Sequence, residues 1–220
     1  MDQRSKAEED LRVIRVLMER ATVYRAISAP TAIVAGSLSI LAAGAIYWNN
    51  EGTPVFGRAI RGREFVMVWL AVLIMAAAAN TFFIWREARK NGRPFISSGM
   101  KLALRAITPC LLIPMAFTGW FYSTGYLGAA ELDLVVVWVV FYGLALLSTT
   151  LFAPHSLAIL GWAFLLSGLA LPALTNLIEY FSIDLPLVTM GVTFGAYHLI
   201  YAVCSWPWKR AGKAVQMPLE

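Results

Sequence analysis

Charged residues are few in this 220-residue sequence: Asp, Glu, Lys and Arg together make up 14%, where about 25% is usual for soluble domains. Acids are missing from the interior of its apolar stretches and stand at or beyond their edges, at Glu64, Glu131, Asp133, Glu179 and Asp184. Proton pumps and ion-coupled carriers usually need ionisable side chains within the membrane. The scarcity of such residues argues against both classes.

Cysteine and histidine are also scarce, with two of each in the sequence. Cys110 and Cys204 both fall in apolar stretches, where a thiol behaves as a small hydrophobe, so no disulfide framework is implied. The sequence contains no metal-spaced histidine pair, paired-cysteine motif, Gly-rich phosphate loop or G-x-S-x-G turn. It therefore predicts no catalytic residue, no metal site and no cofactor.

The two histidines raise two sharper hypotheses, which the pattern does not favour. Haem ligation by His155 and His198 is disfavoured because His155 lies in a predicted turn and His198 well inside an apolar stretch, whereas two axial ligands must reach one iron. Ser148 and His198 lie where rhomboid proteases carry their catalytic pair, but ALLSTT around Ser148 lacks the glycines that flank such a nucleophile.

Apolar residues are abundant instead, at 59% of the chain, above the roughly 45–50% of soluble domains. They form six runs of about 20 residues, the length that crosses a bilayer as a helix. The runs are Ser28 to Trp48, Phe65 to Trp85, Leu102 to Tyr122, Leu132 to Phe152, Ser156 to Asn176 and Leu185 to Trp206. We expect an all-α polytopic membrane protein: an amphipathic cytoplasmic segment over 1–27, six transmembrane helices over 28–206 and a cytoplasmic tail over 207–220.

Basic residues predict the orientation of these helices. A cluster between the second and third runs fits the cytoplasmic side, where Lys and Arg gather, and places both termini in the cytoplasm of a bacterial inner membrane. Arg58, Arg61 and Arg63 then fall outside, which the pattern leaves unexplained. The basic residues expected to contact anionic lipid or a partner are Arg12, Arg15, Arg86, Arg89, Lys90 and Arg93. Because the basic residues flank apolar runs, nucleic acid is not expected as a partner.

Small residues predict where helices pack. Gly191, Gly195, His198 and Ala202 are spaced by four, three and four residues, so they share one face of a regular helix. Ala32 and Gly36 form a four-residue pair in the first run. Small residues at this spacing let two helix backbones approach closely in lipid.

A few polar residues fall inside the runs. Asn80, Thr108, Ser148, His198 and Tyr201 all lie in the predicted cytoplasmic half, where they could line a cytoplasm-facing pocket with His198 at its base. The alternative, which we favour, is that the hydroxyls bond carbonyls of their own helices and that Asn80 and His198 join neighbouring helices.

Three stretches carry a resemblance: EDLRVIRVLMERATVYRAISAP before the first run, LFAPHSLAILGWAFLLSGL at the fourth-to-fifth connection, and GVTFGAYHLIYA near the end. Their combination resembles a group of uncharacterised bacterial integral membrane proteins along the full length. The resemblance implies a bacterial membrane protein and brings no activity, ligand or catalytic residue.

These observations favour a non-enzymatic integral membrane protein, an accessory or regulatory subunit that packs with a protein partner, a copy of itself or lipid. The alternative is a transporter or channel for a neutral or weakly charged small molecule through the cytoplasm-facing pocket. The third hypothesis is a membrane-embedded cofactor binder or enzyme that uses His198.

Overall fold

The chain is described here from a computed structural model. It covers residues 9, 28–51, 59–90, 92, 95–96, 98–125, 131–150, 153–179 and 184–206, with the backbone alone at 98, 99 and 176–179. Within these ranges the prediction of an all-α chain is confirmed, because every regular element is helical. Apart from Glu9, the predicted amphipathic segment over 1–27 lies outside the described residues, as do Arg93 and the predicted tail over 207–220.

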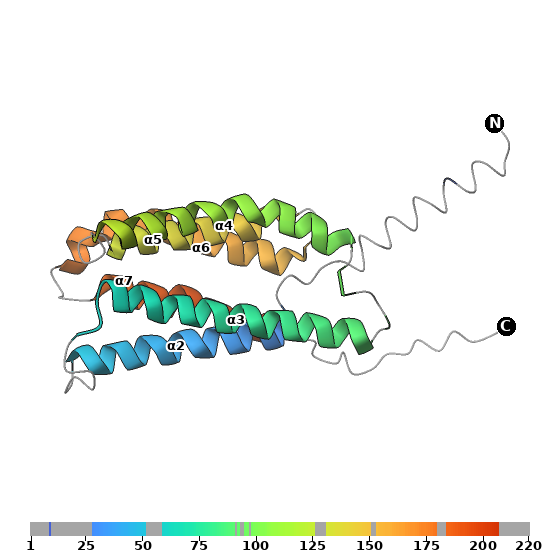
Figure 1. Ribbon diagram of the computed structural model, residues 1–220, viewed down its shortest axis with the longest axis horizontal. Coiled ribbons are helices and arrows are strands. Elements are labelled where there is room, and N and C mark those ends of the chain that lie inside the picture. Colours follow the sequence, from blue (N-terminus) through green and yellow to red (C-terminus); the bar gives the residue numbers. More distant parts are fainter. Residues whose placement is uncertain are drawn as a thin grey trace, which may run out of the picture.

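Six helical rods make up the described fold (Figure 1). They are α2 (Ala29–Glu51), α3 (Arg63–Lys90), α4 (Ser98–Thr124), α5 (Glu131–Leu147), α6 (His155–Glu179), and a last rod in which α7 (Leu185–Met190), the π-helix η2 (Gly191–Tyr197) and α8 (His198–Ser205) follow one another without a break. The rods alternate in direction, so the bundle has one end at Glu131 and the other at Lys90, named below the Glu131 end and the Lys90 end.

Five of the rods are long and apolar enough to cross a membrane: α2, α3, α4, α6 and the last rod. The chain is therefore an α-helical protein with the make-up of a multi-pass membrane protein. The exception is α5, which has 17 residues and stops at Leu147, short of the predicted end at Phe152. The hydroxyls of Ser148 and Thr149 donate hydrogen bonds to the carbonyls of Ala145 and Leu146. These side chains compete with the backbone for helix carbonyls, and residues 148–150 form a turn instead of continuing the helix.

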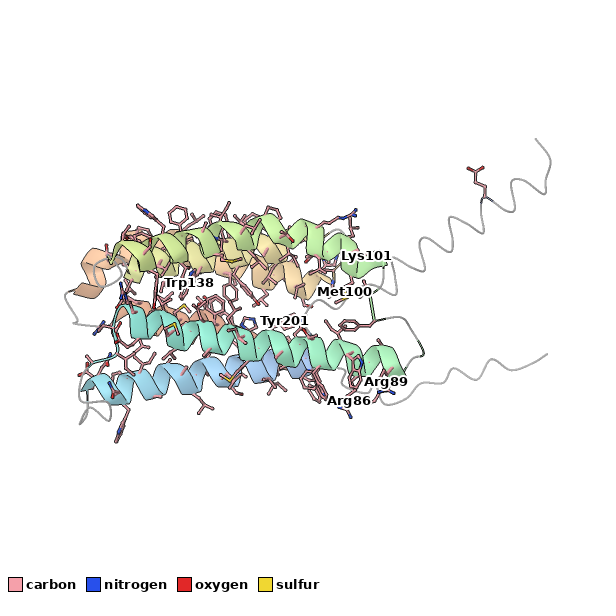
Figure 2. All side chains as sticks on the ribbon, viewed as in Figure 1. Arg86, Arg89, Met100, Lys101, Trp138 and Tyr201 are labelled. Carbon is pink, nitrogen blue, oxygen red and sulfur yellow. The ribbon has the colours of Figure 1, made fainter. Side chains whose placement is uncertain are left out.

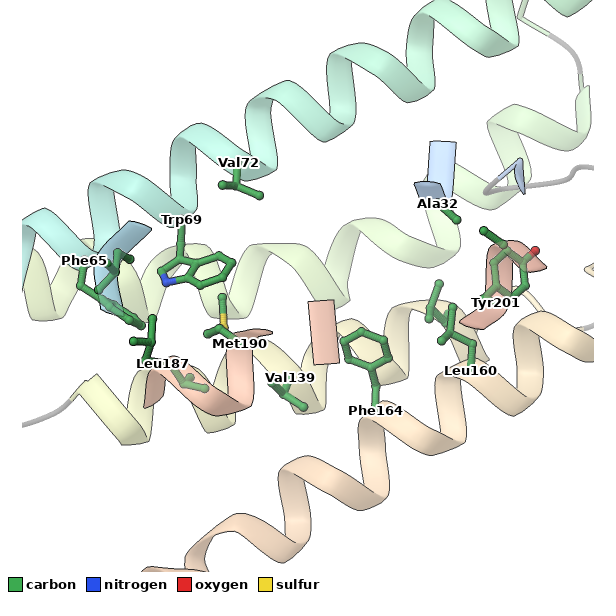
Figure 3. Close-up of a cluster of buried hydrophobic side chains, with 14 of the residues drawn as sticks. Ala32, Phe65, Trp69, Val72, Val139, Leu160, Phe164, Leu187, Met190 and Tyr201 are labelled. Atoms are coloured by element: carbon green, nitrogen blue, oxygen red, sulfur yellow. The ribbon is translucent and has the colours of Figure 1, made fainter. Parts of the chain in front are cut away.

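The last rod lies at the centre of the bundle. It packs against α2 on one side and against α5 and α6 on the other, while α3 pairs with α2 and α4 with α5. Figure 1 shows the result as two layers, α2 with α3 and α4 with α5 and α6. The buried core between them includes Val139, Phe164 and Met190 from three rods (Figure 3).

The connection between α5 and α6 forms the tight antiparallel hairpin that its shortness predicts. Small residues bring the two helices together: a Cβ on Gly143 would lie 2.7 Å from the Leu165 nitrogen, and one on Gly168 would lie 2.6 Å from the Val140 side chain. Backbones this close need glycine, since any side chain would occupy the same space.

Tryptophan in a membrane protein favours the headgroup level, yet Trp69 is 3% exposed and stands in the core beside Phe65 and Met190 (Figure 3). Its indole faces the centre because it falls on the buried side of α3 with Val66 and Val72. The third run, which contains Pro109 and Pro114, forms one helix, α4, without unwinding at either proline.

Candidate functional site

His198, at the start of α8, is a buried polar residue of the central rod. Its side chain is 3% exposed, and Nε2 lies 2.8 Å from the hydroxyl of Tyr142 on α5. Nδ1 is buried as well and makes no hydrogen bond within the described structure. The imidazole therefore joins the last rod to α5 through one of its two nitrogens.

Aromatic rings surround this histidine. Phe164 of α6, fully buried, lies with its ring centre 5.6 Å from that of His198 and 4.7 Å from that of Tyr142. Phe194 of η2 stacks on the imidazole at 6.3 Å. A second polar pair, Ser167 and Tyr197, is joined at 2.8 Å between their hydroxyls. The centre is thus a packed cluster of rings with two interhelical hydrogen bonds.

The glycines of η2 face the opposite side, toward α2. A Cβ on Gly195 would lie 2.6 Å from Ile40, one on Gly191 would lie 3.3 Å from Ala43, and one on Gly36 would lie 2.9 Å from the Gly195 carbonyl oxygen. Ala32 and Ala202, the other predicted packing residues, are both buried in the core.

The face that the sequence spacing predicts is therefore divided. Gly191 and Gly195 contact α2, whereas His198 contacts α5 and α6. The spacing assumes 3.6 residues per turn, but residues 191–197 form a π-helix, whose wider turn rotates all that follows. The sequence gives no sign of this change.

The other predicted pocket residues are dispersed. Asn80 accepts a hydrogen bond from the Thr31 hydroxyl at 3.1 Å, joining α3 to α2. The hydroxyls of Thr108 and Ser148 bond carbonyls of their own helices, at Leu104 and Ala145. Tyr201 is buried in the core one turn beyond His198. Among the described residues, no hydrogen bond or ring contact joins Asn80, Thr108 or Ser148 to His198.

Three charged residues that the sequence analysis did not predict to meet lie together at the Glu131 end. Arg61 lies 3.0 Å from the Asp184 carboxylate and 3.9 Å from that of Glu131. Glu131 also accepts a hydrogen bond from the Gly62 nitrogen, and Asp184 caps α7 at the Leu187 nitrogen. The cluster joins the approach to α3 with the starts of α5 and α7. It also explains Arg61, whose charge meets two of the acids found at the same edge.

Burial raises the pKa of the Glu131 carboxyl, against the opposing effects of the Gly62 hydrogen bond and the Arg61 charge. Since an acid whose pKa is raised on folding favours the folded state most when protonated, this contribution is lost as the pH rises through the folded-state pKa. We expect Glu131→Gln, a neutral mimic that keeps an acceptor for Gly62, to melt at or above the wild type near pH 7.5, with the difference vanishing toward about pH 4.

Melting curves of the purified protein between these pH values check this expectation. Asp133→Asn, which neutralises an exposed acid in the same helical turn, is the control and should keep the wild-type pH dependence. If Glu131→Gln instead melts well below the wild type near pH 7.5, the ionised carboxylate stabilises the cluster and the expectation is wrong.

Basic side chains gather at the opposite end of the bundle. Figure 2 shows Arg86 and Arg89 near the end of α3 and Lys101 near the start of α4. All three are exposed, as is Lys90, and the Arg89 guanidinium lies 5.0 Å above the Trp85 ring. Arg12, Arg15 and Arg93, predicted for the same role, lie outside the described residues.

No protein-family model, curated protein or solved structure matches this chain. The described residues also contain no group of three or more His, Cys, Asp or Glu side chains that could hold a metal ion.

Proposed function

We propose that this chain is a non-enzymatic accessory or regulatory subunit of a bacterial inner membrane, which packs α3 and α4 against a protein partner within the bilayer. In this proposal all six rods cross the membrane, and the Lys90 end, with its exposed basic residues, faces the cytoplasm. The Glu131 end faces outward, where Arg61 and its two acids form a compact paired group.

The observation that carries the proposal is how little of α3 and α4 is buried by the rest of the described chain. Only 11% of the most apolar stretch of α3 and 6% of that of α4 are buried, against 33–44% for the other three candidate spans. No residue of α3 beyond Val72 is buried. Among the described side chains of α4, only Ala103, Pro114 and Thr118 are.

The residues on these exposed surfaces favour a protein partner over lipid alone. Ala77 and Ala78 are exposed on α3, and a Cβ placed on Gly119 of α4 would meet no atom within 4 Å. Small exposed residues leave room for another helix backbone to approach, and close packing is what drives helix association in membranes. The exposed arginines near the end of α3 extend the same surface into the headgroup region.

A photo-crosslinking amino acid placed at Ile74 on α3 or at Leu112 on α4 tests the proposal in native membranes. We expect a discrete protein adduct from both positions, seen as a band of higher mass on a denaturing gel. Ile159 on α6, which is 70% exposed, is the matched control and should give no such band. An adduct of twice the chain's mass identifies a second copy as the partner, and any other mass a different protein.

The proposal fails if Ile74 and Leu112 give no protein adduct under conditions in which a known membrane complex cross-links. It also fails if Ile159 gives the same adduct at equal yield, because α3 and α4 would then hold no special surface.

A further inference from the structure

An open cleft lies at the Glu131 end, against the first turns of α3. Its volume is about 810 Å³, within the range of roughly 300–1,000 Å³ typical of small-molecule sites. The residues that line it are Ala59, Ile60, Arg63, Glu64, Met67, Val68 and Tyr122. The lining combines one cation and one anion with an apolar wall, which is the pattern of an amphiphile's site.

Arg63 is held in place within this cleft. Its guanidinium lies 5.0 Å above the Tyr122 ring, and Nη2 donates to the Tyr122 carbonyl oxygen at 3.4 Å. A guanidinium has five N–H donors arranged to match the oxygens of a phosphate. One bond to a carbonyl therefore leaves Arg63 able to bind a phosphate group through other donors.

Glu64 follows Arg63 directly and gives the cleft a carboxylate. A carboxylate offers about four acceptor positions, so it can receive an ammonium group while taking part in other interactions. A ligand that carries a phosphate and an ammonium a short distance apart would match both charges. A ligand with a phosphate alone would place its negative charge beside Glu64 as well as Arg63, at an electrostatic cost.

The depth of the cleft fits a lipid. Arg63 is the first residue of α3, and Trp120, 57% exposed near the end of α4, stands at the same end of the bundle, as expected at the headgroup level. Met67 lies one turn further along α3 and is also 57% exposed, in the direction of the hydrocarbon. The cleft thus runs from the charged boundary of the bilayer into its apolar layer.

We propose that this cleft binds a phospholipid whose headgroup carries both a phosphate and a primary ammonium, as in phosphatidylethanolamine. The phosphate binds Arg63, the ammonium binds Glu64, and an acyl chain lies along Met67 and Val68. The inference rests on the proposed membrane insertion and does not depend on the partner of α3 and α4.

The test uses the full chain, purified in a mild detergent and stripped of lipid. Phosphatidylethanolamine and phosphatidylglycerol with identical acyl chains are titrated, and bound lipid is counted by native mass spectrometry. We expect the wild type to prefer phosphatidylethanolamine, Arg63→Gln to weaken its binding by about tenfold, and Glu64→Gln to remove the preference between the two lipids. Glycerophosphoethanolamine, which has no acyl chains, should bind far more weakly than the lipid.

Two further variants keep the test decisive. Met67→Trp narrows the cleft at its apolar wall. It should weaken the binding of both lipids without changing the preference between them. Arg105→Gln removes an exposed arginine of α4, toward the Lys90 end, and should leave binding unchanged. Melting curves of each variant establish that it is folded.

Equal binding of both lipids by the wild type, or identical behaviour of Arg63→Gln and Arg105→Gln, overturns the lipid site. If that result comes from a chain that stays in the membrane through a carbonate wash, the proposed membrane role survives. A chain that the wash releases overturns both proposals.

Discussion

Replacing Gly143 by leucine is expected to prevent α5 and α6 from packing. A Cβ at this position would lie 2.7 Å from the Leu165 nitrogen and 2.8 Å from the Gly161 carbonyl oxygen, both backbone atoms of α6. Backbone within a helix cannot move aside as a side chain can. Overpacking a core costs about 1–3 kcal/mol and sometimes more, and here we expect the upper end or beyond, because α5 and α6 form the most extensive helix pair.

The measurement is the yield and melting temperature of folded protein in detergent, followed by size-exclusion chromatography. Gly44→Leu is the matched control, since a Cβ at Gly44 meets nothing within 4 Å. Its free energy of unfolding should lie within about 0.5 kcal/mol of that of the wild type, as is general for surface substitutions. Equal melting of Gly143→Leu and Gly44→Leu would mean that the two backbones are further apart than the structure places them.

Removing the Tyr142 hydroxyl has the next largest expected effect. Tyr142→Phe leaves Nε2 of His198 without its partner, in a ring whose Nδ1 already makes no hydrogen bond. A buried polar group left unpaired costs about 1–3 kcal/mol. We therefore expect Tyr142→Phe to lower the stability of the bundle by that amount. His198→Ala should lower it further, because it also opens a cavity beside Phe164.

A double variant tests whether the two residues stabilise the bundle as a hydrogen-bonded pair. Changing both partners to apolar residues of similar shape, as in Tyr142→Phe with His198→Leu, removes the unpaired groups and is expected to bring stability close to that of the wild type. Thermal melting of the two single variants and the double variant measures the coupling. A Tyr142→Phe protein as stable as the wild type would show that the hydrogen bond contributes nothing.

The helices were predictable because their lengths follow from the apolar content of the chain, and five of the six rods have the expected size and composition. The ends of the helices were less predictable. Where Ser148 and Thr149 bond nearby carbonyls, α5 stops although the sequence stays apolar. Apolarity predicts that a segment will leave water, but local hydroxyl bonding decides where its helix ends.

The candidate sites were only partly predictable. His198 was identifiable as a polar residue in an apolar run, but its partner Tyr142 was not, because a tyrosine among apolar residues has no distinctive spacing. Arg61, Glu131 and Asp184 are far apart in the sequence and meet only through the fold. A usable signal did exist. Arg58, Arg61 and Arg63 are predicted at the same edge of the membrane as several acids, and opposite charges at one edge favour ion pairs.

The π-helix of the last rod has a consequence for aligning this chain with another sequence. Its seven residues contain one more residue than a regular helix needs to cover the same rotation, as though a single amino acid had been inserted between Gly191 and Tyr197. A sequence that forms an unbroken α-helix here would align only across a one-residue gap. Without that gap, the position matched to His198 would be its neighbour, about 100° away around the helix.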